Sequence, residues 1–491
     1  MAAHRFLLLA VMALAGCGGG GSSSSSSTAT GWVAGVFPPS ASFAGQCSML
    51  AENNYLRSWT NENYLWFDEV VDRNPALSTT PAYFDLLKTT ATTASGNPKD
   101  RFHFTFDTAA WNAFSQSGVS PGYGAELIVV ASTPPRRIVV AYTEPGSPAT
   151  GASLARGAEI LTVDGVDAVN NNTSSGVDML NAGLFPDHAG ETHTFTVRDI
   201  GGTTRTVSMQ SANVTETPVQ NVITNLPGQV GYLLFNDHIA TAETELVSAI
   251  NTLKAASITD LVLDIRYNGG GFLDIAGELA YMIAGSSAVG RTFEQTVFNS
   301  KIGAFPPSTF PTITLGFSLP EGQPLPTLNL PRVFVLTGSS TCSASESIIN
   351  SLRGIGVTVI QVGSTTCGKP YGFFPQDNCG TTYFSIMFRG VNAVGFGDYA
   401  DGFSPQNTVG AAGTQVPGCS VGDDFTHALG DPAEARLAAA LNYRSTSTCP
   451  APSGFAPPSG ARTSVRATLA SPGAAVKSRA PWRENRLLRP Q

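Results

Sequence analysis

The chain has 491 residues, of which 42% are apolar, so it is long enough for roughly two to four domains with buried cores. Only 13% of the residues are charged, whereas 51 are glycine and 32 are proline, a profile that favours an exported protein over a highly charged cytosolic one. The net charge of −8 argues against nucleic acid as a general partner.

Residues 1–17 have the layout of a secretory signal, with a short basic start followed by an apolar run too short to span a bilayer. The signal ends in Leu-Ala-Gly-Cys, which resembles a bacterial lipobox, in which Cys17 would carry the lipid. An ordinary signal peptide with a chance cysteine is the alternative. Residues 18–42 are rich in glycine and serine and predict a flexible tether. The sequence therefore predicts a lipoprotein anchored through Cys17 to a membrane of the bacterial cell envelope, on the periplasmic side or at the cell surface.

The remaining six cysteines are an even number and allow up to three disulfides in an oxidising compartment. The connectivity is open, but Cys367 and Cys379 flank a stretch with the composition of a hairpin and are predicted to pair. No cysteines have the C-x-x-C spacing and the histidines are scattered, so the sequence predicts no metal site.

The next two regions differ in pattern. Residues 43–117 carry aromatic residues at helical spacing and predict a small helical domain with these rings in its core. Residues 118–212 contain short β-strand patterns. Within them, "SPATGASLARGAEILTVDGVDA" resembles a PDZ domain, with Glu159 where aspartate is usual. PDZ domains bind chain ends by adding them as a strand. A β-rich spacer that binds nothing is the alternative.

Residues 213–447 alternate between strand and helix patterns, which predicts βαβ units and a largely parallel sheet with functional sites at the carboxyl ends of its strands. The predicted strands are 230–235, 259–267, 332–338 and 357–363, and the predicted helices are 242–256, 273–284 and 343–354. Residues 448–491 carry seven Lys or Arg against one Glu from residue 450 onward and have no apolar periodicity, so we expect a disordered basic tail.

Two strand ends contain candidate chemistry. "LDIRYNGGGF" (263–272) ends in glycines whose bare N–H groups are suited to an oxyanion, although a tight turn is the simpler interpretation of three glycines alone. "SSTCSASE" (339–346) begins a helix, and Ser343 with Glu346 fits a capping box. A nucleophile gains at the same place from the helix dipole and free N–H groups, but needs a base. Lys369, after the next predicted strand, has aromatic residues nearby, and burial among them favours the neutral amine that a base requires.

The segments "LDIRYNGGG", "SASE" and "GKPYG", in this order, resemble the C-terminal-processing (tail-specific) serine peptidases, a family with a Ser–Lys catalytic pair. The resemblance covers about residues 45–410 and implies an α/β fold, with a ClpP/crotonase-like parallel-sheet core, a PDZ-like domain inserted in it or preceding it, and no cofactor. It implies these roles: nucleophile Ser343, general base Lys369, oxyanion hole Gly269 or Gly270 with Ala344, and, as in some members, Glu346 to orient the lysine. Other members use an aspartate on the last turn of the helix, which this sequence lacks, so the third catalytic residue stays open.

The resulting prediction is a serine endopeptidase that hydrolyses exported polypeptides by an acyl-enzyme mechanism and recognises their C-termini. A binding lipoprotein that kept the fold without activity is one alternative. A Ser–His hydrolase that uses His103 or His238 is another.

Overall fold

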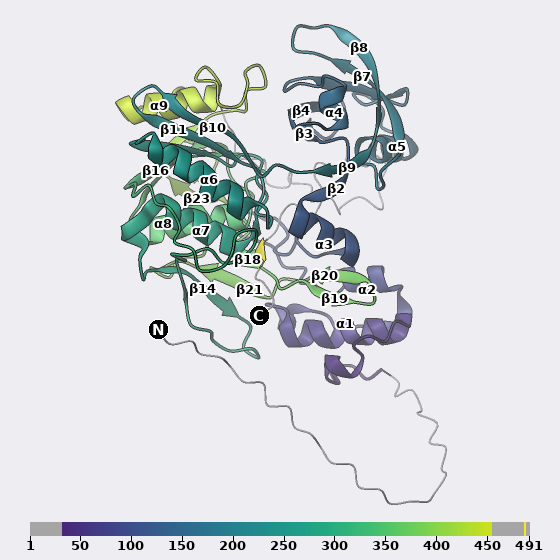
Figure 1. Cartoon of the computed structure of the whole chain (residues 1–491). Helices are drawn as coiled ribbons and strands as arrows, with labels where there is room; N and C mark the ends of the chain where they lie inside the picture. Colours follow the sequence, from purple (N-terminus) through teal and green to yellow (C-terminus); the bar gives the residue numbers. More distant parts are fainter. Residues whose placement is uncertain (1–31, 454–485, 488–491) are drawn as a thin grey trace, which may run out of the picture.

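The computed structural model describes residues 32–453 and 486–487 (Figure 1). The predicted signal peptide, the lipid-bearing Cys17 and the first part of the tether lie outside the described residues. Among the residues described, none of the helices combines the length and the apolar character needed to cross a membrane.

A six-stranded sheet forms the centre of the molecule, and five of its strands run parallel. The first strand in the order is an antiparallel edge. Its strand order is β10 (Val219–Leu226), β11 (Val230–Phe235), β12 (Asp260–Asp264), β16 (Arg332–Thr337), β17 (Thr358–Gly363) and β24 (Gly418–Ser420). The predicted parallel sheet is confirmed, and strand 230–235 has the predicted bounds.

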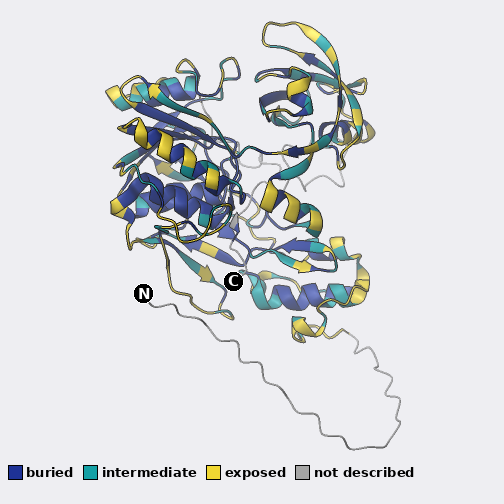
Figure 2. Ribbon diagram, in the orientation of Figure 1, coloured by how far each residue is buried: buried dark blue, intermediate teal, exposed yellow. Residues whose placement is uncertain are grey.

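Both faces of this sheet are buried, which explains why its strands read as continuous apolar runs. Along β12, Leu261 and Leu263 pack on one face, against helices α6 (Ala242–Ala255), α7 (Leu273–Ala284) and α8 (Ala344–Gly354). Val262 points to the other face, where helix α9 (Ala435–Thr446) packs. All residues of α7 except Asp274 are buried, as expected for a helix packed on nearly all sides (Figure 2).

The N-terminal region is joined to a distant part of the chain. Its helices are α1 (Met49–Asn63), α2 (Thr80–Asp85) and α3 (Thr108–Ser117), with 3₁₀ turns at Ser40–Ser42, Phe67–Glu69 and Pro75–Leu77. The aromatic residues Tyr55, Trp59 and Tyr64 are buried, as predicted. Strand β1 (Phe104–Asp107) pairs with β20 (Thr381–Phe384), which pairs with β19 (Gln376–Asn378). Residues 43–117 therefore share a sheet with a hairpin more than 250 residues later.

A second lobe, residues 123–210, has its own apolar core. Its sheet contains β3 (Ala125–Ala131), β4 (Arg137–Thr143), β5 (Glu159–Val163), β6 (Val166–Asp167), β7 (Thr192–Arg198) and β8 (Thr204–Gln210), with helices α4 (Pro148–Gly151) and α5 (Ser174–Leu184). The antiparallel pair β2 (Val119–Gly122) and β9 (Ala212–Thr215) connects the lobe to the rest of the molecule (Figure 1).

Short strands complete the structure around the core. A four-stranded sheet has the order β15 (Ser308–Thr309), β14 (Thr292–Phe298), β21 (Phe388–Val391) and β18 (Tyr371–Gly372). β22 (Phe403–Pro405) pairs with β23 (Thr414–Val416), and a 3₁₀ turn spans Gly285–Ala288. β13 (Gly271–Phe272) pairs in parallel with β25 (Arg486–Leu487). The latter two residues lie in the tail for which the sequence predicts disorder.

The structure contains three disulfides among the described residues, and the predicted Cys367–Cys379 pairing is wrong. The bonds observed are Cys47–Cys379, Cys342–Cys367 and Cys419–Cys449. Cys379 lies at the turn between β19 and β20 and is bonded to the segment that precedes α1. Cys367 follows β17 and faces the loop that leads into α8. The two residues are near in sequence, but the intervening chain carries them to different elements.

Candidate functional site

The loops that carry the predicted site residues meet at one edge of the central sheet. Strands β12, β16 and β17 are parallel neighbours, so their carboxyl ends lie side by side. The loop after β16 is bonded to the other two. The N–H of Cys342 donates to the carbonyl of Asn268 at 3.1 Å, and the N–H of Cys367 donates to the carbonyl of Thr341 at 2.9 Å. The Gly-rich loop, the start of α8 and the loop before Lys369 therefore form one assembly.

Ser343 occupies the N-cap of α8 in an unusual backbone conformation. Its φ of 59° is rare for a residue with a side chain, and such strain clusters at functional sites. The residue is fully buried, and its hydroxyl has no hydrogen-bond partner of good geometry within the described part of the chain. Ser343 and Glu346 form the predicted capping box, in which the Glu346 carboxylate accepts the Ser343 N–H at 2.9 Å. The carboxylate of Glu346 thus fixes the backbone of Ser343.

Lys369 is fully buried beside aromatic rings. Its Nζ lies 4.1 Å from the ring centre of Phe373 and 4.7 Å from that of Phe102. Phe373 is one of the aromatic residues that follow Lys369 closely in the sequence, whereas Phe102 comes from the N-terminal region and was not predicted. Gly368 permits the tight approach of this loop, because a Cβ there would lie 2.3 Å from the carbonyl oxygen of Ala400.

Glu346 ties the two loops together. One carboxylate oxygen accepts the backbone N–H groups of both Ser343, at 2.9 Å, and Lys369, at 2.8 Å. The other accepts the N–H of Gly368 at 2.8 Å and the hydroxyl of Thr366 at 2.5 Å. Burial raises the pKa of Glu346, and these hydrogen bonds offset only part of that effect. The carboxylate is therefore both the helix cap and the anchor of the Lys369 backbone.

The Cys342–Cys367 disulfide adds a covalent tie at the same place. Cys342 directly precedes Ser343, Cys367 is two residues before Lys369, and their Cα atoms are 5.1 Å apart. The two sulfur atoms and a Glu346 oxygen lie within 4.8 Å of one another, a cluster compact enough for a cation. Because the sulfurs are bonded to each other, neither offers the thiolate that a metal site needs.

The Gly-rich loop and the start of α8 each supply one N–H group that donates no hydrogen bond to the described residues. Gly270 donates its N–H to the Asn268 side chain at 2.9 Å, whereas the N–H groups of Gly269 and Ala344 donate to no described group. Of the two glycines that the sequence proposed for an oxyanion hole, Gly269 is thus the one with a free donor. Gly271 must be glycine, because its φ is 141° and a Cβ would lie 2.4 Å from the His238 carbonyl oxygen.

A buried arginine fixes the strand that leads into this loop. Arg266 donates to Asp264 at 2.9 Å and makes a two-pronged contact with Glu434, at 2.8 and 2.9 Å. It also reaches Asp423 at 2.9 Å, and Arg156 of the second lobe contacts the same carboxylate oxygen at 2.8 Å. Burial opposes ionisation of Asp423, but Arg436, Arg266 and Arg156 together hold its pKa well below the usual range. No local pattern in the sequence predicts these long-range partners of the "LDIRY" segment.

The two histidines considered as alternative bases make other contacts. His238 Nδ1 lies 2.9 Å from the Asn268 side-chain oxygen, and burial lowers the pKa of His238 to about 3, so its ring is neutral. His103 Nε2 lies 2.9 Å from the carbonyl of Phe84, on whose ring it stacks. Within the described residues, neither ring is hydrogen-bonded to the Ser343 hydroxyl.

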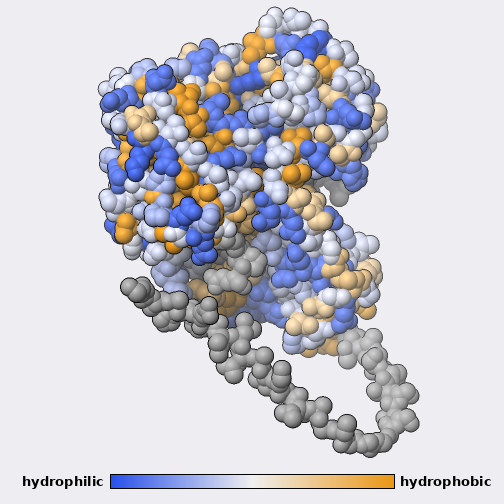
Figure 3. Space-filling view, viewed as in Figure 1, coloured by the Kyte–Doolittle hydropathy of each residue, from blue (hydrophilic) through white to orange (hydrophobic). Residues whose placement is uncertain are grey.

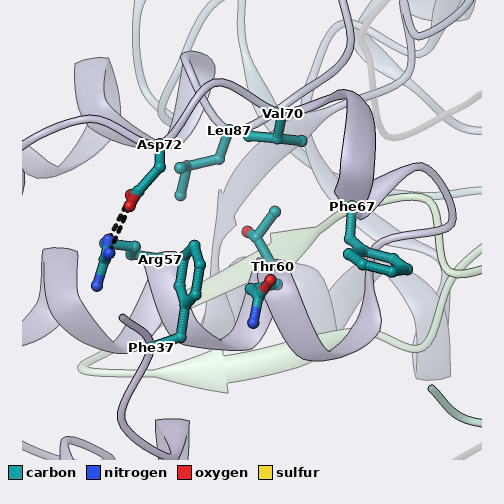
Figure 4. A pocket seen from close by; sticks show the side chains of 8 residues that line it. Phe37, Arg57, Thr60, Phe67, Val70, Asp72 and Leu87 are labelled. Atoms are coloured by element: carbon teal, nitrogen blue, oxygen red, sulfur yellow. Dashed lines mark hydrogen bonds and ion pairs between the residues drawn. The ribbon is translucent and has the colours of Figure 1, made fainter. Parts of the chain in front are cut away.

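A pocket elsewhere lies in the N-terminal region, beside the ion pair of Arg57 with Asp72 (Figure 4). Its lining comes from residues 37–87 and includes none of the predicted site residues. On the face shown in Figure 3, hydrophobic and hydrophilic residues are interspersed over both lobes. Neither feature competes with the sheet edge as the candidate site.

Comparisons with known proteins agree on one family. Residues 229–373 match the model of peptidase family S41. The chain is 29% identical over 258 residues to a carboxyl-terminal-processing protease of Picosynechococcus sp., a match that covers 52% of this chain and 56% of the relative. It is 24% identical over 236 residues to carboxyl-terminal-processing peptidase 2, chloroplastic, of Arabidopsis thaliana, covering 46% and 44%. The chain thus matches about half the length of these relatives.

The fold has a counterpart among solved structures. A Bacteroides fragilis protein assigned as an S41 protease superposes with a TM-score of 0.60 at 22% identity, over 80% of this chain and 97% of that one. This likeness shows a shared S41 peptidase fold of mixed α/β content. The family match includes the Gly-rich loop, the start of α8 and Lys369. Over residues 229–373, the chain is therefore similar to peptidase family S41.

Proposed function

We propose that this protein is a serine endopeptidase of the C-terminal-processing type, in which Ser343 is the nucleophile and Lys369 the general base. One observation carries the proposal. A buried serine hydroxyl without a described partner stands at a helix N-terminus, and the same carboxylate oxygen of Glu346 holds its backbone and that of the buried lysine. A cap alone would not need the positive φ of Ser343 or the second loop.

The proposed mechanism is acyl transfer. The neutral Lys369 amine takes the Ser343 proton as the hydroxyl oxygen attacks a peptide carbonyl carbon. The N–H groups of Gly269 and Ala344 stabilise the negative charge that develops on the carbonyl oxygen, helped by the dipole of α8. Lys369 then passes the proton to the leaving amine, and water hydrolyses the ester by the reverse sequence of proton transfers. Glu346 is a positioning residue in this scheme, because its oxygens contact backbone and Thr366.

The further parts of the proposal concern the surroundings of the site. The parallel sheet with helices on both faces supports a ClpP/crotonase-like core, and the lobe of residues 123–210 supports a PDZ-like domain that presents substrate C-termini. Export, and anchoring by a lipid on Cys17 in the bacterial cell envelope, are supported by the predicted signal and by three disulfides among the described residues.

The test is hydrolysis of casein by the purified protein from residue 18 onward and by matched variants. Ser343→Ala and Lys369→Ala are each expected to lower kcat by at least about 1,000-fold, whereas His103→Gln and His238→Gln keep a Lys369-dependent activity. Activity is expected to rise toward alkaline pH as the lysine amine loses its proton. If the wild type cleaves no casein, the result favours the alternative of a binding protein without activity. If Lys369→Ala stays active while one histidine variant is inactive, the Ser–Lys assignment is wrong.

A further inference from the structure

The C-terminal segment of the chain forms a strand at the candidate site. Residues Arg486–Leu487 pair in parallel with Gly271–Phe272, and Leu487 also bridges to Phe373. Figure 1 shows this short strand in yellow beside β18. Two separate loops of the site therefore pair with Leu487.

The strand Arg486–Leu487 pairs with residues close in sequence to the proposed oxyanion donor and to the proposed base. Gly271 follows Gly269 by two residues, and Phe373 follows Lys369 by four. Leu487 thus lies between the loop with the proposed oxyanion donor and the loop with the proposed base. The contacts to it are main-chain pairing, which is how extended peptides are recognised at exposed strand edges.

Leu487 provides the apolar part of the contact. It is 1% exposed and belongs to the same apolar cluster as Phe272 and Phe373. Among the described residues of the tail, Leu487 therefore makes the apolar contact with the site.

We propose that the C-terminal segment around Arg486–Leu487 occupies the substrate groove of its own chain as an extended strand, competes there with other polypeptides, and marks the position at which the groove selects a large aliphatic side chain. The inference rests on the proposed function for the identity of the groove. Residues 454–485, between the two described parts, could span about 100 Å if extended, so the chain is long enough for the contact within one molecule.

A tethered ligand of this kind lowers activity by a predictable amount. Linkers give effective concentrations on the order of 1 mM, and a short peptide with a Kd of about 0.1 mM would then fill the groove roughly ten times as often as it is empty. Removal of residues 486–491 is therefore expected to raise the initial rate of casein cleavage about tenfold at subsaturating substrate. The ratio is expected to be independent of enzyme concentration.

The experiment compares the full chain with the chain ending at residue 485, and adds the peptide of residues 481–491 to the shortened enzyme. The peptide is expected to raise KM for casein and leave kcat unchanged. A peptide with Leu487→Met is expected to retain this effect, and one with Leu487→Asp to lose it. Equal rates for the two chains, or a rate ratio that grows with enzyme concentration, would overturn occupation by the same molecule.

Binding is measured separately from cleavage. The same labelled peptides are titrated into the shortened chain with Ser343→Ala, using fluorescence anisotropy. If the peptide with Leu487 binds and the Leu487→Asp peptide does not, the inference is supported. This holds even if none of the enzymes cleaves casein, and in that case only the proposed function fails. Absence of peptide binding to this folded variant, as judged by an unchanged Tm, overturns the inference even if casein is cleaved.

Discussion

The sheet edge with the candidate site and the second lobe hold their carboxylates in different ways. Glu346, at the sheet edge, is fully buried and accepts hydrogen bonds from four groups of two loops. Glu159, on strand β5 of the lobe, faces Arg137 and Arg198, whose side chains are about half exposed. Figure 2 shows the same contrast more widely, with dark helices around the site and many lighter residues on the strands of the lobe.

Loss of Glu346 and loss of Glu159 should therefore have different consequences for the surrounding structure. A buried main-chain N–H group cannot form a hydrogen bond with water when its acceptor is lost. Glu346 therefore fixes the geometry of the loops that it joins. Partly exposed arginine side chains exchange a carboxylate for solvent at little cost. We therefore expect changes at the sheet edge to alter catalysis and stability together, and changes at the lobe surface to alter neither appreciably.

Among the changes that test this comparison of carboxylates, the largest effect is expected from Glu346→Gln. The side-chain NH₂ cannot accept the N–H groups that one carboxylate oxygen receives, so two buried donors are left unsatisfied at roughly 1–3 kcal/mol each. Misplacement of the loops by about 1 Å lowers kcat by about 100-fold. Casein turnover and urea unfolding measure the two effects.

Glu278→Gln is the matched control for that variant. Glu278 is another buried carboxylate of the same core and accepts one described N–H, from Leu315 at 2.8 Å. The hydrogen bond described for it leads to Leu315 and not to either site loop, so kcat of Glu278→Gln should equal that of the wild type. Equal kcat for Glu346→Gln and the wild type would contradict the proposed role of Glu346.

A smaller effect on turnover is expected when the Cys342–Cys367 bond is removed by changing both residues to alanine. The bond closes a loop between residues 25 apart, and its loss should lower the free energy of unfolding by about 3 kcal/mol. Since Glu346 still joins the loops, we expect kcat to fall about tenfold rather than to vanish.

The Cys419–Cys449 pair provides the comparison. It joins residues 30 apart and lies away from the residues that contact Ser343 and Lys369. Changing both to alanine should lower the stability by a similar amount and leave kcat unchanged. A parallel loss of kcat in the two double variants would mean that the disulfide beside Ser343 acts through overall stability alone.

The sequence predicted the elements of the sheet edge but not the contacts between them. Continuous apolar runs and helical periodicity placed strand 230–235 and helix 273–284 with the bounds observed. Parallel topology then brought Ser343 and Lys369 to neighbouring strand ends. The partners that arrive from far along the chain had no local signal. Phe102, the Cys47–Cys379 bond and the strand at Arg486–Leu487 depend on how the whole chain closes, which periodicity does not encode.

An intermediate effect, on stability alone, is expected from the pH dependence of Glu278. Burial and the nearby Glu243 raise the pKa of Glu278 to about 9. A pKa that is higher in the folded state than in the unfolded state stabilises the fold fully at low pH, and this contribution declines with rising pH until it is lost above the folded value. The urea midpoint of the wild type should therefore fall between pH 6 and pH 10. Glu278→Gln should fall less over that range, and identical slopes would show that Glu278 is already ionised in the folded protein.

The smallest effect is expected from Arg137→Gln, which removes one partner of Glu159 in the lobe. The side chain of Arg137 is 49% exposed, and exposed ion pairs contribute about 0.2–1 kcal/mol. Partial burial acts to raise the pKa of Glu159, but Arg137 and Arg198 together hold it below its ordinary value, and Arg198 stays in place in this variant. Urea unfolding should shift by less than about 1 kcal/mol, and casein turnover should not change. A loss of kcat in this variant, with its stability intact, would mean that the lobe surface influences the sheet edge, and the contrast between Glu346 and Glu159 would then be one of distance from the site rather than of independence from it.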